Sequence, residues 1–143
     1  GFLLSYIYTG DTQMVQLSKK LANYFLNRLP EDAVCHWDLA LVGTDALRDS
    51  SSAAIAVCGL LELIKHLPVT DPDRECYQQW AMGIMSSLTR HYLMGKDEQG
   101  NGLLKHSVYH LSSNKGVDEC ASWGDYFYVE ALMRFSESWK LYW

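Results

Sequence analysis

The spacing of apolar and polar residues predicts two helices that each bury one face. In residues 11–29 the apolar side chains recur every three or four positions, while Lys and Asn side chains occupy the other side. Residues 71–93 show the same pattern. Their first two residues, Asp71 and Pro72, form a strong start signal, because an N-cap is followed by a proline at the first helical position. We therefore expect both segments to lie at the surface of a helical fold.

Two further segments are apolar on nearly all sides. Residues 49–67 and 118–137 each leave only a thin polar strip, so we expect both helices to be enclosed between other elements. Residues 1–8 read as the last turns of one more helix, which Gly10 ends. The resulting order of buried and surface helices is a repeat of αα-hairpins, and it predicts an all-α fold of about five helices.

Two long connections, residues 31–48 and 94–117, each precede one of the apolar helices. Since short links follow these helices and long loops precede them, both loops should lie at one end of the fold. The second loop contains two turn signals, around Gly100 to Gly102 and Asn114 to Gly116, and the segment between them could pair as a short hairpin. We take this end as the candidate binding site.

Four residues at this end are candidates for contact with a ligand. Arg48 and Asp49 begin an apolar helix, where Asp49 with the following serines is on the simplest interpretation an N-cap, and otherwise part of a binding rim. Trp37 and Tyr109 are large aromatic residues in loops, where stacking on a ligand is an alternative to core packing.

Composition and charge narrow the possible partners. The chain of 143 residues is long enough for one domain, and its net charge of -5 with scattered Lys and Arg argues against nucleic acid. No apolar run approaches the roughly 20 residues that a bilayer span needs. His106 and His110 lie four apart without a third ligand of suitable spacing, so we expect no metal, and no cofactor motif is present. The four cysteines share no close spacing, which predicts unpaired thiols and a cytoplasmic protein, with the periplasm as the alternative.

Several short segments, in order along the chain, carry a resemblance to a known family. They are Tyr8-Thr9-Gly10-Asp11, Trp37-Asp38, Arg48-Asp49-Ser50-Ser51, Gly59-Leu60-Leu61-Glu62-Leu63, His106-Ser107-Val108-Tyr109-His110 and Trp123-Gly124-Asp125-Tyr126-Phe127-Tyr128. Together they resemble the unsaturated glucuronyl hydrolases, glycoside hydrolase family 88. The resemblance implies a six-hairpin α/α toroid, of which residues 1–143 would be the C-terminal part of one domain.

What the resemblance implies chemically is hydration of a double bond. Members of that family hydrolyse unsaturated uronate oligosaccharides released by polysaccharide lyases: an aspartic acid protonates C4 of the C4=C5 bond and water adds at C5. Other glycosidases use two carboxylates across the glycosidic bond instead. The family's catalytic aspartates would fall before Gly1, so we expect no catalytic residue in this chain. Among the family's substrate-contacting groups, the resemblance carries over Tyr109.

The chain starts in mid-helix, so we expect a fragment. Half a toroid leaves apolar helices uncovered, and this predicts either self-association or a missing N-terminal half that covers them. Two alternatives to a part of a glucuronyl hydrolase stay open. One is a non-catalytic helical-repeat or carbohydrate-binding module, and the other is an unsaturated rhamnogalacturonyl hydrolase with a similar toroid.

Overall fold

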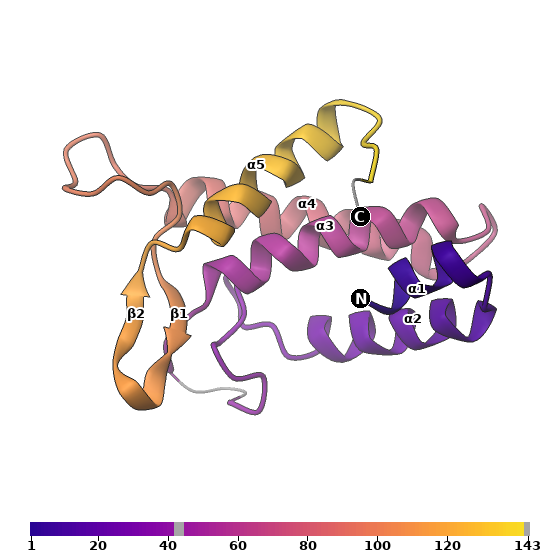
Figure 1. Ribbon diagram of the computed structural model, residues 1–143, viewed down its shortest axis with the longest axis horizontal. Helices are drawn as coiled ribbons and strands as arrows, with labels where there is room; N and C mark the ends of the chain where they lie inside the picture. Colours follow the sequence, from indigo (N-terminus) through magenta and orange to yellow (C-terminus); the bar gives the residue numbers. More distant parts are fainter. Residues whose placement is uncertain (42–44, 142–143) are drawn as a thin grey trace.

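The computed structural model describes residues 1–41 and 45–141 (Figure 1). Within them the chain forms helices and a small hairpin. The α-helices are α1 (Phe2–Thr9), α2 (Thr12–Leu26), α3 (Ser50–His66), α4 (Asp73–Ser87) and α5 (Ser122–Ser136), and the strands are β1 (Ser107–His110) and β2 (Lys115–Glu119). A π-helical turn, η1 (Leu88–Tyr92), continues α4, and a 3₁₀ turn, η2 (Leu111–Ser113), joins the strands. The predicted helical fold is confirmed.

Helix α3 is the centre of the fold. Helices α4 and α5 pack along it, α2 lies against its C-terminal half, and α1 folds back on α2 (Figure 1). Ten of its 17 residues are buried, among them Ala53, Val57 and Leu63, whereas Ile55 stays 41% exposed, so the helix is enclosed on most sides but not on all. Burial of such residues excludes water from the apolar surface and supplies most of the stabilisation of the fold.

Helix α5 departs from its prediction in two ways. It begins at Ser122, because β2 continues to Glu119, which pairs with Ser107, and Asp118 is an unpaired residue of the same strand. It is also less enclosed than expected: Gly124, Tyr128, Glu130 and Ala131 are buried, whereas apolar side chains on its other faces stay exposed. The described residues cover one side of this helix.

The N-terminal ends of the helices follow the predicted capping signals. The Asp49 carboxylate accepts hydrogen bonds from the backbone of Ser51 and Ser52 at the start of α3, and Asp11 does the same for Gln13 in α2. Asp71 accepts from the Asp73 backbone, with Pro72 between them. At the other end of α1, Gly10 adopts φ +74° as the left-handed closing residue.

Strands β1 and β2 form the antiparallel hairpin (Figure 1). Its turn includes Asn114, at φ 50°, as the second turn signal predicts. The first signal, around Gly100 to Gly102, belongs instead to a separate loop before the hairpin. The strand after this loop is anchored on α3, because the Ser50 backbone donates to His106 O at 3.1 Å.

Both long connections meet at the N-terminal end of α3, as the alternation of loops predicts. The Asp49 backbone donates to Cys35 O at 2.9 Å, which brings the first loop to the residue that caps the helix. Residues 42–44 of the predicted loop 31–48 lie outside the described residues. None of the helices in the described part of the chain is both long enough and apolar enough to cross a bilayer.

Candidate functional site

The base of the hairpin is fixed to the start of α3 by buried hydroxyl groups. Ser50 Oγ donates to Lys105 O at 2.6 Å and lies 3.1 Å from Ser107 Oγ, and both serines are almost fully buried. Buried polar groups are stable when they are hydrogen-bonded, so these contacts tie β1 firmly to the helix. The hairpin, and with it Tyr109, therefore has a defined place over the helix ends.

Helix α5 holds the other side of this junction. Asp125 Oδ1 accepts from the backbone of Leu103 at 2.9 Å and of Leu104 at 2.8 Å. One residue earlier, Gly124 approaches α3 so closely that an added Cβ would lie 3.0 Å from Ser51 Cβ. This close approach requires a residue without a side chain at position 124. It packs α5 and α3 together at the end where the loops meet.

The Asp49 carboxylate is buried and saturated with hydrogen bonds. Oδ1 accepts from Ser51 Oγ at 2.7 Å and from the Ser51 backbone at 3.1 Å, and Oδ2 accepts from Ser52 Oγ at 2.6 Å. Only 7% of the residue is exposed. The geometry is that of an N-cap with two further hydroxyl partners, which is the simpler of the two interpretations of this residue.

Trp123 and Tyr109 come together above this cap. The Trp123 indole Nε1 donates to Ser51 Oγ at 3.1 Å, and its ring lies 5.6 Å from the Tyr109 ring at an interplanar angle of 57°. The two residues belong to different elements, α5 and β1, and both are exposed, at 40% and 68%. Tilted aromatic pairs at this separation attract one another, so the two rings form one aromatic corner.

Arg48 faces a different surface. Its Nε donates to Asp32 Oδ2 at 3.1 Å, and Nη1 lies 2.9 Å from His36 Nδ1. The Tyr92 hydroxyl also donates to Asp32 Oδ2, at 2.6 Å. Burial by itself would raise the pKa of Asp32, but the hydrogen bonds from Tyr92 and Arg48 outweigh it and lower the pKa. The guanidinium is thus held in an ion pair beside a hollow of about 500 Å³ that Tyr92 and His106 also line.

Trp37 lies on the other side of the α3 start. Its backbone donates to Leu47 O at 3.0 Å, and its half-exposed ring lines a hollow of about 390 Å³ with Phe25, Leu39 and Ile55. All four predicted residues therefore lie around one end of the fold. Arg48 and Trp37 nevertheless face separate hollows, whereas Asp49 and Tyr109 are linked through Ser51 and Trp123.

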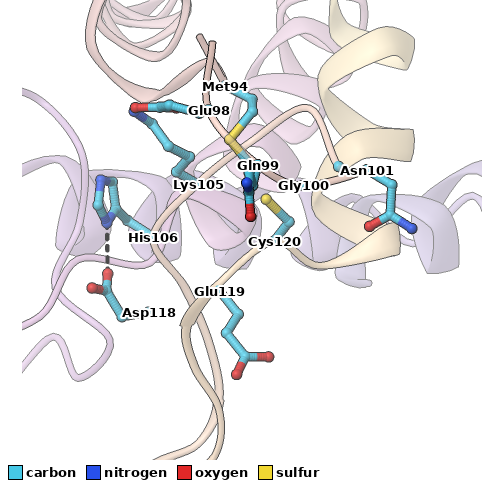
Figure 2. A pocket seen from close by; sticks show the side chains of 11 residues that line it. Met94, Glu98, Gln99, Gly100, Asn101, Lys105, His106, Asp118, Glu119 and Cys120 are labelled. Carbon is cyan, nitrogen blue, oxygen red and sulfur yellow. Dashed lines mark hydrogen bonds and ion pairs between the residues drawn. The ribbon is translucent and has the colours of Figure 1, made fainter. Parts of the chain in front are cut away.

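A larger hollow of about 590 Å³ lies behind the hairpin, between it and the loop before it (Figure 2). His106, just before β1, and Asp118, on β2, form one of its walls, with His106 Nδ1 2.6 Å from Asp118 Oδ1. Both residues have positive φ, 66° and 60°, so this contact is made by a locally strained backbone. Among the described residues, no group of three His, Cys, Asp or Glu side chains could hold a metal ion.

Sequence reasoning missed the arrangement around Trp123. The sequence favours helix packing over a pocket floor for most of the segment Trp123-Gly124-Asp125, and the structure divides these roles among its residues. Gly124 and Asp125 hold α5 to its neighbours, while the Trp123 ring stays exposed beside Tyr109. A tryptophan at the very start of a helix, directly after a hairpin, is the signal that could have pointed to the site.

Comparison with known proteins gives a consistent match over the whole chain, although no protein-family model matches it. The chain is 47% identical to the unsaturated chondroitin disaccharide hydrolase of Streptococcus pneumoniae, over 100% of its own length and 36% of the relative. It superposes with a TM-score of 0.94 and 48% identity on a variant of Streptococcus agalactiae unsaturated glucuronyl hydrolase complexed with dGlcA-GalNAc6S, covering 100% of this chain and 38% of that one. Over its whole length the chain is similar to one part of the unsaturated glucuronyl hydrolases, so the resemblance is confirmed.

The family likeness extends to more distant members. The unsaturated glucuronyl hydrolase of Bacillus sp. GL1 is 35% identical, with a TM-score of 0.89 over 96% of this chain and 37% of that one. These solved enzymes have the α/α toroid fold, so the predicted fold class is confirmed. The chain spans about a third of the length of the unsaturated glucuronyl hydrolases that it matches.

Proposed function

We propose that the protein containing this chain hydrolyses unsaturated glucuronyl oligosaccharides of the kind that polysaccharide lyases release. The observation that carries this proposal is the match over the whole chain, at 48% identity and a TM-score of 0.94, to an enzyme complexed with dGlcA-GalNAc6S. In the proposed reaction a proton adds to C4 of the C4=C5 double bond and water adds at C5. The hemiketal that results opens and releases the aglycone as an alcohol.

The proton donor of this reaction must stay protonated near working pH, which requires a raised carboxyl pKa. In the described part of the chain, every carboxyl with a shifted pKa is shifted down. These carboxyls belong to Asp32, Glu62, Asp71 and Glu98, and each accepts hydrogen bonds from Lys, Arg or Tyr side chains. The shifts support the proposal that this chain supplies no catalytic acid and is inactive alone.

The part assigned to this chain is substrate binding. Tyr109, exposed on β1, would contact the sugar directly, and Trp37 and Arg48 would border the site from their separate hollows. Asp49 would act behind the surface, because its carboxylate is buried and bonded to Ser51 and Ser52. Its role is then to position the residues above it.

We also propose a cytoplasmic location for the protein. All four cysteines are free thiols, at positions 35, 58, 76 and 120. Burial raises the pKa of Cys35 and of Cys58 to about 12, so these two thiols are protonated and unreactive at neutral pH. Unpaired cysteines in this number fit a reducing compartment better than an oxidising one.

The proposed reaction is tested by following the ultraviolet absorbance of the C4=C5 double bond. The full natural protein that contains this chain is mixed with unsaturated chondroitin disaccharide, and the 143-residue chain serves as the comparison. The absorbance should fall with the full protein and stay constant with the chain alone. A full protein that leaves the double bond intact, or that acts only on an unsaturated rhamnogalacturonyl disaccharide, would overturn the proposal.

A further inference from the structure

We propose that Trp123 contacts the substrate directly, and that its indole and the Tyr109 ring together receive the apolar face of the neutral sugar next to the unsaturated uronate. This inference rests on the proposed function and adds a specificity-determining residue to it. It divides the substrate between two parts of the site. The aromatic corner of Trp123 and Tyr109 binds the aglycone sugar, and the charged uronate lies outside this corner.

The Trp123 indole is held in place by a hydrogen bond from its nitrogen to a buried serine. Trp123 Nε1, the single hydrogen-bond donor of the side chain, donates to Ser51 Oγ, and the Ser51 hydroxyl in turn donates to Asp49 Oδ1 at 2.7 Å. Both residues behind the indole are buried. The polar atom of the ring is thus used inside the protein, and the exposed remainder is apolar aromatic surface.

Both residues of the aromatic corner are exposed. Tyr109 and Trp123 are 68% and 40% exposed, and their rings lie against each other with centroids 5.6 Å apart. Their positions are fixed: Gly116 on β2, at φ +55°, lies so close to Tyr109 that an added Cβ would be 3.0 Å from its Cβ. Rigid aromatic rings provide contact area at a low cost in conformational entropy, which suits them to ligand binding.

The charges of the side chains around the aromatic corner favour a neutral sugar ring over the uronate at this place. A carboxylate requires a cation or several hydrogen-bond donors, and the nearest anchor behind the indole is itself the Asp49 carboxylate. Arg48, the cation of the α3 start, is paired with Asp32 and faces another hollow. Like charges repel, so the corner selects the uncharged apolar face of a pyranose ring.

The experiment compares two substrates in the full natural protein that contains this chain. One is unsaturated chondroitin disaccharide, and the other is the methyl glycoside of the same unsaturated uronic acid, which lacks the second sugar. Trp123→Ala should raise the KM for the disaccharide about tenfold and change the KM for the methyl glycoside less than about twofold, because only the disaccharide uses the ring. Trp123→Phe should raise the disaccharide KM about threefold.

Tyr8→Ala is the matched control, because Tyr8 is an exposed aromatic residue near the end of α1, outside the site and outside α5. It should leave both KM values unchanged. Thermal unfolding of each variant verifies its fold, and Trp123→Phe serves as the test if Trp123→Ala does not fold. Equal effects on the two substrates, or no effect on the disaccharide, would overturn this inference alone. A wild-type protein inactive on both substrates would instead overturn the proposed function.

Discussion

Gly124 lies at a close approach of α5 to α3, and its lack of a side chain is a packing requirement. An added Cβ would lie 3.0 Å from Ser51 Cβ and 3.4 Å from Ser107 Oγ, two atoms on different elements. Ser51 is also the residue that holds the Trp123 indole. A substitution at position 124 therefore affects both the stability of the junction and the geometry of the aromatic corner.

We predict that Gly124→Ala lowers the free energy of unfolding by about 1–3 kcal/mol, because it overpacks a junction that has no room for a methyl group. Gly83→Ala is the control. Position 83 lies in α4, where an added Cβ meets nothing within 4 Å, so the same change should stabilise the helix by about 0.5–1 kcal/mol. Urea unfolding measures both values. Two variants of equal stability would contradict the close approach.

Asp49 provides a second test at this scale. We predict that Asp49→Ala destabilises the protein by about 2 kcal/mol, because α3 loses its cap and the hydroxyls of buried Ser51 and part-buried Ser52 lose their acceptor. Asp11→Ala removes a cap with one exposed hydrogen bond, to the Gln13 backbone, and should cost only about 0.5–1 kcal/mol. The comparison is made by chemical unfolding, and a larger loss for Asp11→Ala would contradict the assignment.

At the scale of the elements, a buried ion-pair network joins α3 and α5 toward their C-terminal ends. Arg134 Nη1 lies 2.6 Å from Glu62 Oε2, and Arg134 Nε lies 2.7 Å from Glu130 Oε1. The Arg134 side chain is 5% exposed. Burial by itself would raise the pKa of Glu62, but the hydrogen bonds from Arg134 and Lys65 outweigh it and lower the pKa. The two helices are thus held together at both ends. Gly124 packs against Ser51 at the N-terminal end, and Arg134 pairs with Glu62 toward the C-terminal end.

We predict that Glu62→Ala costs about 3–5 kcal/mol of unfolding free energy at neutral pH, because it leaves Arg134 buried with half of its counter-charge. Lys65→Ala removes an exposed partner of the same carboxylate, at 41% side-chain exposure, and should cost less than about 1 kcal/mol. Unfolding in urea distinguishes the two. Equal losses would show that the network is not buried in solution.

The same network gives a pH dependence with a definite sign. Because the pKa of Glu62 is lower in the folded than in the unfolded protein, its contribution is complete above the ordinary carboxyl value of about 4 and is lost as the pH falls through the folded pKa. The wild-type protein should therefore lose stability below about pH 4, and Glu62→Gln should lose less over the same range. Parallel curves for the two proteins would contradict this assignment.

Sequence periodicity predicted the elements well where one face or all faces of a helix are apolar, as in α2 and α3. It failed at Asp118 and Glu119, because an acidic pair before an apolar run is typical of a helix start. The pairing of Glu119 with Ser107 in the hairpin depends instead on distant sequence. Tyr109 was predicted from the family resemblance. The Ser51 anchor of Trp123 joins residues 72 positions apart, so no local pattern could have revealed it.

At the scale of the whole molecule, two apolar surfaces remain exposed on the described chain. One follows α5 and includes Val129, Leu132 and Phe135, each at least 40% exposed. The other is a hollow of about 270 Å³ lined by Leu21, Phe25 and other mainly apolar residues of α1, α2 and α3. Monomeric proteins rarely expose contiguous apolar area of this kind, which supports the proposal that another segment or a second copy covers it.

We predict that the isolated 143-residue chain self-associates at micromolar concentration, because association removes these surfaces from water. Sedimentation velocity measures the species present, and replacing Leu132 and Phe135 by Ser should shift them toward the monomer. A strictly monomeric wild-type chain that melts cooperatively would contradict this prediction.

The central claim is that the end of the fold where α3, α5 and the hairpin meet faces the sugar. A crystal structure of the full natural protein with unsaturated chondroitin disaccharide bound tests it most directly. We predict that the neutral sugar stacks against the Trp123 indole and contacts Tyr109, with the uronate beyond them. A disaccharide bound in the hollow behind the hairpin, beside His106 and Asp118, with both aromatic rings free, would contradict it.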